Sequence, residues 1–326
     1  MRHALLALLA STTPALAAGP EFTVYAPEYF ASEWGPGPKI EEGFEAICDC
    51  DLVFVTGDVL PRILLEGEGT KADAVIGLSM DQTLRARDSG LFAPHGQDIS
   101  NLTMPLTWDD PIFLPFNWSE TAFIYDETRL ADPPHSFHEL IEAPDDLKIV
   151  IQDPRSSVSG LALLMWMREV FGSEGNAEAW EKLKPKILTV TQGWSEAYGM
   201  FTDGEADMVL SFTTSPAYHI GAEGDTTKHA AIFEEGHYLL AELAAQVKTS
   251  DQPELAEKFM EYILSPDFQG MIAEANWSYP SKLPDDQLPD YFSALPRPAI
   301  TLWLPEDEAE ALRKPLLDEW LSVFAN

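Results

Sequence analysis

A strand–helix alternation that runs twice along the chain constrains the fold most. β-Branched and aromatic runs predict strands, and amphipathic runs that follow them predict helices. The first series places strands and helices in turn at residues 21–25, 39–49, 51–56, 60–65, 72–78 and 80–90. This order is typical of an α/β lobe with a mainly parallel sheet, whose ligands sit beyond the carboxyl ends of the strands.

The second series follows an extended aromatic segment at residues 112–126. Its predicted strands and helices lie at residues 147–153, 161–172, 177–183, 187–191, 194–204 and 206–212. Residues 230–233 and 237–247 then read as extended, which predicts a second crossing between the lobes. A chain of 326 residues is too long for one compact core. The expected fold is therefore α/β with two lobes, joined by two crossing strands, and a ligand cleft between them.

The domain boundaries follow from this order. Lobe 1 is expected at residues 18–115 plus 234–290, lobe 2 at 116–233, and a C-terminal helical segment packing on the lobes at 291–326. Residues 1–17 read as a cleaved signal peptide, since Arg2 precedes a short apolar run and Ala15–Leu16–Ala17 forms a small-residue cleavage site. That run is too short to span a bilayer, so the mature protein is expected in the periplasm.

The charge excludes one large class of function. The whole chain carries a formal net charge of -34, and removal of a signal that contains Arg2 and no acid makes it more negative still. Such a chain cannot bind nucleic acid by neutralising phosphates. A negative field attracts cationic small molecules, although acidity also serves solubility and by itself names no ligand.

The two cysteines, Cys48 and Cys50, stand in the triplet CDC at the end of the first predicted helix. No paired CxxC motif of a zinc or redox site is present. The oxidising compartment permits a local disulfide between them, which we favour over two free thiols.

Five short stretches place aromatic residues beside glycine, serine or proline at predicted element ends. They are EWGPGP with Trp34, PFNWSE with Phe116 and Trp118, QGWSEAYG with Trp194 and Tyr198, SFTTSPAY with Phe212 and Tyr218, and ANWSYP with Trp277 and Tyr279. Single aromatic residues more often pack in a core. Several rings around one cleft would instead form a cage for a cation or a flat heteroaromatic ring.

Two polar positions accompany these rings. Asp58 follows the second strand and could accept N–H donors or serve only as a helix N-cap. Ser157, in the DPRSSVSG loop, could offer a hydroxyl at a helix start, or again a simple cap. Catalytic patterns are absent from the sequence: the seven histidines are scattered, and no H-E-x-x-H, G-x-S-x-G, P-loop or G-x-G-x-x-G motif occurs.

The motifs WGPGP, GWSEAYG and TTSPAYH together give the chain a close resemblance to the periplasmic thiamine-binding proteins of bacterial ABC transporters. The resemblance runs nearly end to end and implies the two-lobed type II binding-protein fold. It implies capture of thiamine, or of its phosphates, and delivery to an inner-membrane permease and its ATPase. It further implies a monomer without a cofactor or a metal, and with no catalytic residue.

The resemblance also implies which residues contact the ligand: Trp34, Asp58, Ser157, Trp194, Phe212, Tyr218 and Trp277. The rings would clasp the aminopyrimidine and the thiazolium, and Asp58 would accept from the pyrimidine amino group. Two positions depart from the family pattern. Phe212 and Pro27 each stand where close relatives have a tyrosine.

Three alternatives remain from the residues. A thiaminase-like enzyme on the same fold would need a cysteine nucleophile in the cleft, whereas both cysteines are predicted at the opposite end of the sheet. A polyamine is a second cationic ligand that suits an aromatic and acidic cleft. Ferric ion, the third, is bound in related proteins by adjacent tyrosines, and no Tyr-Tyr pair occurs here.

Overall fold

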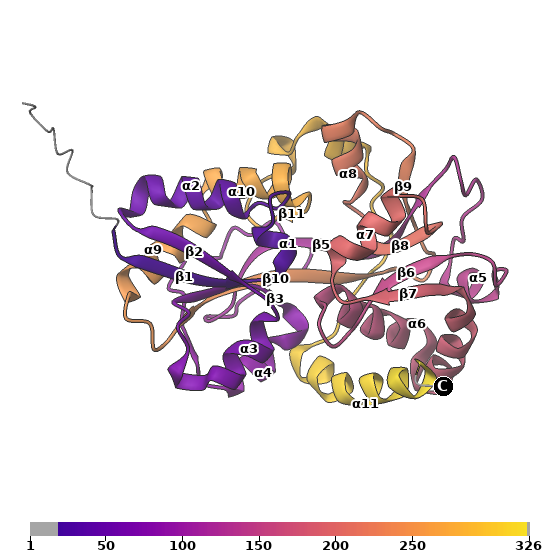
Figure 1. Cartoon of the computed structure of the whole chain (residues 1–326), viewed down its shortest axis with the longest axis horizontal. Helices are drawn as coiled ribbons and strands as arrows, with labels where there is room; N and C mark the ends of the chain where they lie inside the picture. The colour runs from indigo at the N-terminus through magenta and orange to yellow at the C-terminus, as the bar shows by residue number, and fades with distance from the viewer. Residues whose placement is uncertain (1–18, 325–326) are drawn as a thin grey trace, which may run out of the picture.

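The computed structural model describes residues 19–324 as two α/β lobes side by side, joined by two long strands (Figure 1). The proposed signal peptide, residues 1–17, lies outside the described residues. Within residues 19–324, no helix combines the length and the apolar character needed to cross a membrane.

The sheet of lobe 1 has the order β2-β1-β3-β10. Strands β1 (Glu21–Ala26), β2 (Asp51–Thr56) and β3 (Ala74–Ser79) run parallel, so their carboxyl ends meet at one edge. Their side chains are mostly buried because helices cover both faces of the sheet. One face carries α2 (Gly37–Cys48), α9 (Pro253–Ile263) and α10 (Pro266–Met271), and the other carries α3 (Val59–Glu66) and α4 (Thr83–Asp88).

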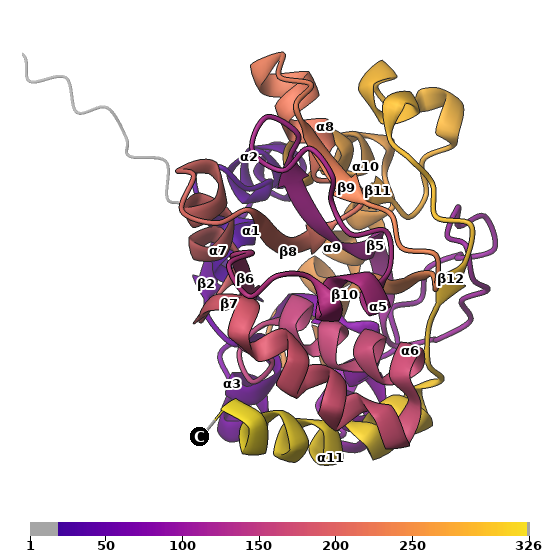
Figure 2. The same ribbon diagram turned by 90° about the vertical axis from the view of Figure 1, so that its right-hand side faces the viewer.

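Lobe 2 repeats this plan with the order β5-β8-β6-β7. Strand β6 (Ile149–Gln152) lies parallel to β7 (Ile187–Thr191) and to β8 (Met208–Phe212). Helices α5 (Phe137–Glu142) and α6 (Val158–Leu183) cover one face, and α7 (Trp194–Thr202) covers the other (Figure 2). Helix α6 is interrupted at Gly172, where the backbone φ is 64°, which is where the sequence predicted a helix to stop.

Two antiparallel strands connect the lobes. Strand β5 (Leu114–Asp126) pairs with β10 (His237–Val247) from Glu120 opposite Leu239 to Leu114 opposite Ala244. Beyond this stretch β5 pairs with β8 and with β9 (Lys228–Ala231) in lobe 2, while β10 pairs with β3 in lobe 1. The two crossing strands predicted from the sequence are therefore confirmed.

Shorter elements complete the chain. They are α1 (Glu28–Ala31), β4 (Phe92–Ala93), α8 (Pro216–Tyr218), β11 (Tyr279–Pro280) and β12 (Thr301–Leu302), with the 3₁₀ turns η1 (Gly67–Gly69), η2 (Met80–Gln82), η3 (Lys184–Lys186), η6 (Asp285–Gln287) and η7 (Asp290–Ala294) and the π-helical turns η4 (His219–Glu223) and η5 (Ile272–Asn276).

The C-terminal helix α11 (Glu306–Phe324) lies beneath both lobes (Figure 1). It packs mainly on α6 of lobe 2, and its buried Leu316 and Trp320 belong to that lobe's core. Its first turn also reaches lobe 1, where the Arg87 guanidinium of α4 pairs with Glu306 at 3.0 Å. This helix therefore contacts both halves of the protein.

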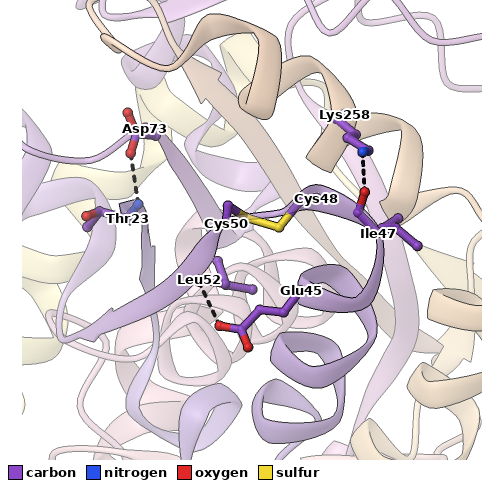
Figure 3. The surroundings of a disulfide bond; sticks show 8 residues. All are labelled: Thr23, Glu45, Ile47, Cys48, Cys50, Leu52, Asp73 and Lys258. Carbon is purple, nitrogen blue, oxygen red and sulfur yellow. Dashed lines mark hydrogen bonds between the residues drawn. A yellow bond between two sulfur atoms is a disulfide. The ribbon is translucent and has the colours of Figure 1, made fainter. Parts of the chain in front are cut away.

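A disulfide joins Cys48, at the end of α2, to Cys50, just before β2 (Figure 3). Around it, the Leu52 backbone N–H donates to Glu45, and the Lys258 ammonium donates to the Ile47 carbonyl. The bridge lies at the amino end of β2, opposite the edge of the sheet at which β1, β2 and β3 end.

Candidate functional site

A cleft of about 430 Å³ opens where the carboxyl ends of the strands from both lobes face each other. Lobe 1 lines it with segments that follow β1, β2 and β3, and lobe 2 with the starts of α6 and α7. The volume falls within the range of small-molecule sites. Of the residues predicted for the ligand site, this cleft brings together Asp58, Ser157 and Trp194.

Two helix N-termini point into the cleft from lobe 2. Ser157 is the N-cap of α6, where its hydroxyl accepts from the Gly160 backbone N–H at 3.4 Å. Gly193 is the N-cap of α7 and offers no side chain to the first turn, so backbone donors there are open to another acceptor. The positive ends of both helix dipoles therefore favour polar or anionic ligand atoms on this side.

Trp194 is held in place from behind. Its indole N–H donates to the Ser211 hydroxyl at 2.8 Å, and its ring stacks on Tyr198 with centroids 4.6 Å apart. The Tyr198 hydroxyl lies 2.9 Å from a ring nitrogen of His219. Burial raises the pKa of Tyr198 far above its ordinary value, so this hydroxyl stays protonated. The arrangement presents one preorganised indole surface to the cleft.

Asp58 occupies the N-cap position of α3, yet its side chain makes no capping hydrogen bond. The carboxylate is exposed and lines the cleft. Partial desolvation, and then the charge of Asp153 across the cleft, raise the pKa of Asp58. For Asp153 burial also opposes ionisation, but hydrogen bonds from Arg155 outweigh it and lower the pKa. Asp58 is thus an uncompensated negative group that a cationic or N–H-donating ligand would relieve.

Trp34 stands on the loop between α1 and α2, with 79% of its surface exposed. Within residues 19–324, no ring stacks on it. The loop that carries it is tightly packed, because a Cβ on Gly35 would lie 2.2 Å from the Tyr29 carbonyl oxygen. A rigid loop therefore carries an indole that lies outside the cleft-lining set in this structure.

The remaining three predicted residues, Phe212, Tyr218 and Trp277, do not belong to the set that lines the cleft. Tyr218 meets Trp277 edge to face, with centroids 5.4 Å apart. Trp277 has a φ of 54°, which is unusual for a bulky residue, and it forms the C-cap at which η5 ends. Phe212 is half-buried and packs against the core of lobe 2. Tyr218 also contacts His219, which stacks on Tyr198, so the pair of Tyr218 and Trp277 is connected to the wall formed by Trp194 through a continuous run of ring contacts.

Sequence reasoning missed several residues that line the cleft: Glu28, Tyr29, Gln82, Arg155, Gln192, Ser195 and Glu196. Most of them follow the carboxyl end of a strand or begin a helix, which is the signal that could have identified them. Ser195 donates its hydroxyl to Glu28 at 3.1 Å, so these two residues bridge lobe 2 and lobe 1 across the cleft.

One group with metal-ligand character occurs among the described residues: His219, Glu223 and Asp225. Protein partners already engage its atoms. The two His219 ring nitrogens face Tyr198 and Glu223, while Lys228 pairs with Asp225 at 2.9 Å. Because these atoms already have hydrogen-bond or ion-pair partners, we interpret the group as a support behind the aromatic wall.

Comparison with known proteins shows the same architecture. The profile of the family described as bacterial extracellular solute-binding protein matches residues 44–296. A thiamine-binding periplasmic protein of Brucella abortus is 46% identical over 95% of this chain and 94% of its own length. One of Escherichia coli is 44% identical over 98% of both chains. A solved structure of a periplasmic thiamin binding protein superposes with a TM-score of 0.91, at 44% identity, over 94% of this chain and 96% of that one.

Proposed function

Because this chain belongs to the bacterial extracellular solute-binding proteins, we propose that it is the thiamine-capturing component of an ABC transporter in the periplasm. One observation carries the proposal: opposite lobes bring Asp58, Ser157 and Trp194 to a single cleft. The relatives that match almost the whole chain are named thiamine-binding periplasmic proteins. An export signal at residues 1–17 would place the mature protein there.

The chemistry of the cleft suits thiamine, which is a permanent cation with two flat rings. Trp194 offers a ring face for stacking or a cation–π contact. The Asp58 carboxylate has no hydrogen-bond partner among the described residues and would accept from the aminopyrimidine. The two helix N-termini suit the polar tail, either the hydroxyl of thiamine or a phosphate in its esters.

We further propose that the protein delivers thiamine unchanged to a permease and its ATPase, acting as a monomer. A thiaminase-like reaction would require a nucleophile in the cleft. Cys48 and Cys50 are bonded to each other and lie at the far end of β2. Prolonged incubation of thiamine with the protein, followed by chromatography, should return all of the vitamin. Appearance of free pyrimidine or thiazole would refute a pure transport role.

A thermal-shift panel tests the ligand. Thiamine, its mono- and diphosphate, and spermidine are each added to the mature protein, and calorimetry then measures the affinity. We expect a selective rise of the melting temperature with thiamine or its esters, and about tenfold weaker binding in Asp58→Asn. A rise with spermidine alone would identify a polyamine carrier instead, and a thiamine affinity unaffected by Asp58→Asn would move the site elsewhere.

A further inference from the structure

Tyr29 lines the cleft from lobe 1, two residues beyond Pro27. The Pro27 ring packs directly on Gly77, where an added Cβ would lie 2.4 Å from the proline Cγ. No aromatic group is therefore supplied at position 27. Tyr29, in the short helix α1, brings a ring to the same part of the cleft.

The Tyr29 hydroxyl donates to the Glu242 carboxyl. Glu242 lies on the crossing strand β10 and is only 7% exposed. Its other oxygen accepts from the Asn117 amide at 2.7 Å, on the second crossing strand β5. Tyr29 is thus attached to both strands that connect the lobes.

Glu242 has no cationic partner among the described residues. The groups around it are Tyr29 from α1, Ser79 opposite on β3, Asn117 opposite on β5, and Asn276 from η5. A buried carboxyl without a counter-ion is costly. Burial, only partly offset by Asn276, accordingly raises the pKa of Glu242 to about 8. A ligand cation on the cleft side of Tyr29 would supply the missing positive charge.

We propose that Tyr29, positioned and polarised by Glu242 and Asn117, selects the positively charged ring of the ligand. This inference rests on the proposed function. A phenol that donates to a carboxylate has a more electron-rich ring and oxygen, and therefore attracts a cation more strongly than an isolated phenol. Tyr29 would touch the ligand, whereas Glu242 and Asn117 would act through it.

The test compares thiamine with deazathiamine, its uncharged thiophene isostere, by calorimetry. The variants are Tyr29→Phe, Glu242→Gln and the control Tyr125→Phe, whose ring packs on His229 outside the cleft-lining set. We expect the wild type to prefer thiamine. Tyr29→Phe and Glu242→Gln should each lower the ratio of the thiamine affinity to the deazathiamine affinity by about tenfold. The control should keep the wild-type ratio.

A pH series separates this role from simple support. In the wild type, thiamine affinity should rise between pH 6 and 8 as Glu242 ionises, and the rise should disappear in Glu242→Gln. If Glu242→Gln does not fold, the affinity ratio measured for Tyr29→Phe decides the test. A wild type that binds thiamine while both variants keep its selectivity would overturn the inference only. A wild type that does not bind thiamine would overturn the proposed function as well.

Discussion

The two lobes present recognition groups to the cleft in different states. In lobe 2, Trp194 is hydrogen-bonded to Ser211 and stacked on Tyr198. In lobe 1, Asp58 makes no capping bond, and Trp34 is largely exposed on a rigid loop. The recognition residue of lobe 2 is thus already fixed by protein contacts, whereas Asp58 and Trp34 of lobe 1 have few protein contacts and are available to the ligand. A substitution of the recognition residue in lobe 2 should therefore lower both ligand affinity and protein stability. A substitution in lobe 1 should lower ligand affinity alone.

The largest effect is expected from Trp194→Ala. Loss of the indole removes the ligand contact and also the stack on Tyr198. Thiamine affinity should fall by about 30-fold or more, as for a desolvated cation–π contact of ~2 kcal/mol. The free energy of unfolding should fall by about 2 kcal/mol, less than for a fully buried tryptophan. Calorimetry measures the affinity and urea unfolding measures the stability. A loss of affinity without a loss of stability would show that Trp194 does not differ from the lobe 1 residues in this respect.

Trp34→Ala is the matched substitution in lobe 1. Thiamine affinity should fall by about tenfold if the indole closes over the ligand. The melting temperature of the unliganded protein should stay within about 1 °C, because an indole this exposed buries little surface. Binding equal to that of the wild type would show that Trp34 plays no part in the cage.

The lobes should also differ in their response to pH. Asp81 and Glu242 lie in or beside lobe 1, and burial raises their pKa values to about 7 and about 8. The folded state retains these protons where the unfolded chain has lost them, so the free energy of unfolding should fall as pH rises. In lobe 2, burial opposes ionisation of Asp126, yet hydrogen bonds from Thr128 and Lys228 lower its pKa to about 2. Its stabilisation is lost only as pH falls from about 4 towards 2.

His237, on β10, changes the free energy of unfolding with pH in the opposite direction. Burial lowers its pKa to about 4, so stability gained from it rises between pH 4 and 6.5 and is then constant. Above pH 6.5 the decline due to the two buried acids is no longer opposed by His237, and it should end near pH 8, where Glu242 ionises in the folded state. Urea unfolding across this range should show it, and Asp81→Asn combined with Glu242→Gln should flatten the curve. A wild-type stability that increases over this range would contradict the assignment.

The smallest effect is expected where the lobes touch. Ser195→Ala removes the hydroxyl that donates to Glu28 across the cleft. Thiamine affinity should fall about two- to fivefold, the value of one partly exposed hydrogen bond. Ser195→Thr, which keeps the hydroxyl and leaves the cleft charge unchanged, is the control and should bind like the wild type. An effect of Ser195→Ala above tenfold would mean that the bridge controls closure.

Long elements were predictable from the sequence because their own periodicity defines them. The strand at residues 51–56 was predicted with its observed ends, and the crossing strands within two residues of theirs. Neither helix α5 nor helix α1 was predicted, since the sequence pattern assigned no element to their residues. Short elements such as α1 and β11 form because a neighbouring element pairs with them or covers them. The local sequence pattern does not reveal that neighbour.

The residues of the candidate site also fall into those that the local sequence predicts and those that depend on tertiary contacts. The carboxyl-end rule pointed to Asp58, and the cleft contains it. Tyr29 was missed because it belongs to α1 and because its acceptor, Glu242, lies more than 200 residues further along the chain. Phe212 stands beside predicted cage residues in the sequence, but its ring packs against a core. Side-chain direction at an element end depends on tertiary packing, which spacing alone does not give.

The late return of β10 affects the order in which the halves assemble. Strands β6, β7 and β8 are complete by residue 212, whereas β3 in the centre of lobe 1 waits for a partner that begins at residue 237. Until the last third of the chain arrives, β3 exposes an unpaired edge that invites pairing with other molecules. A polypeptide that emerges amino end first would thus pair the strands β6, β7 and β8 of lobe 2 before the sheet of lobe 1 is complete, although the core of lobe 2 still awaits α11.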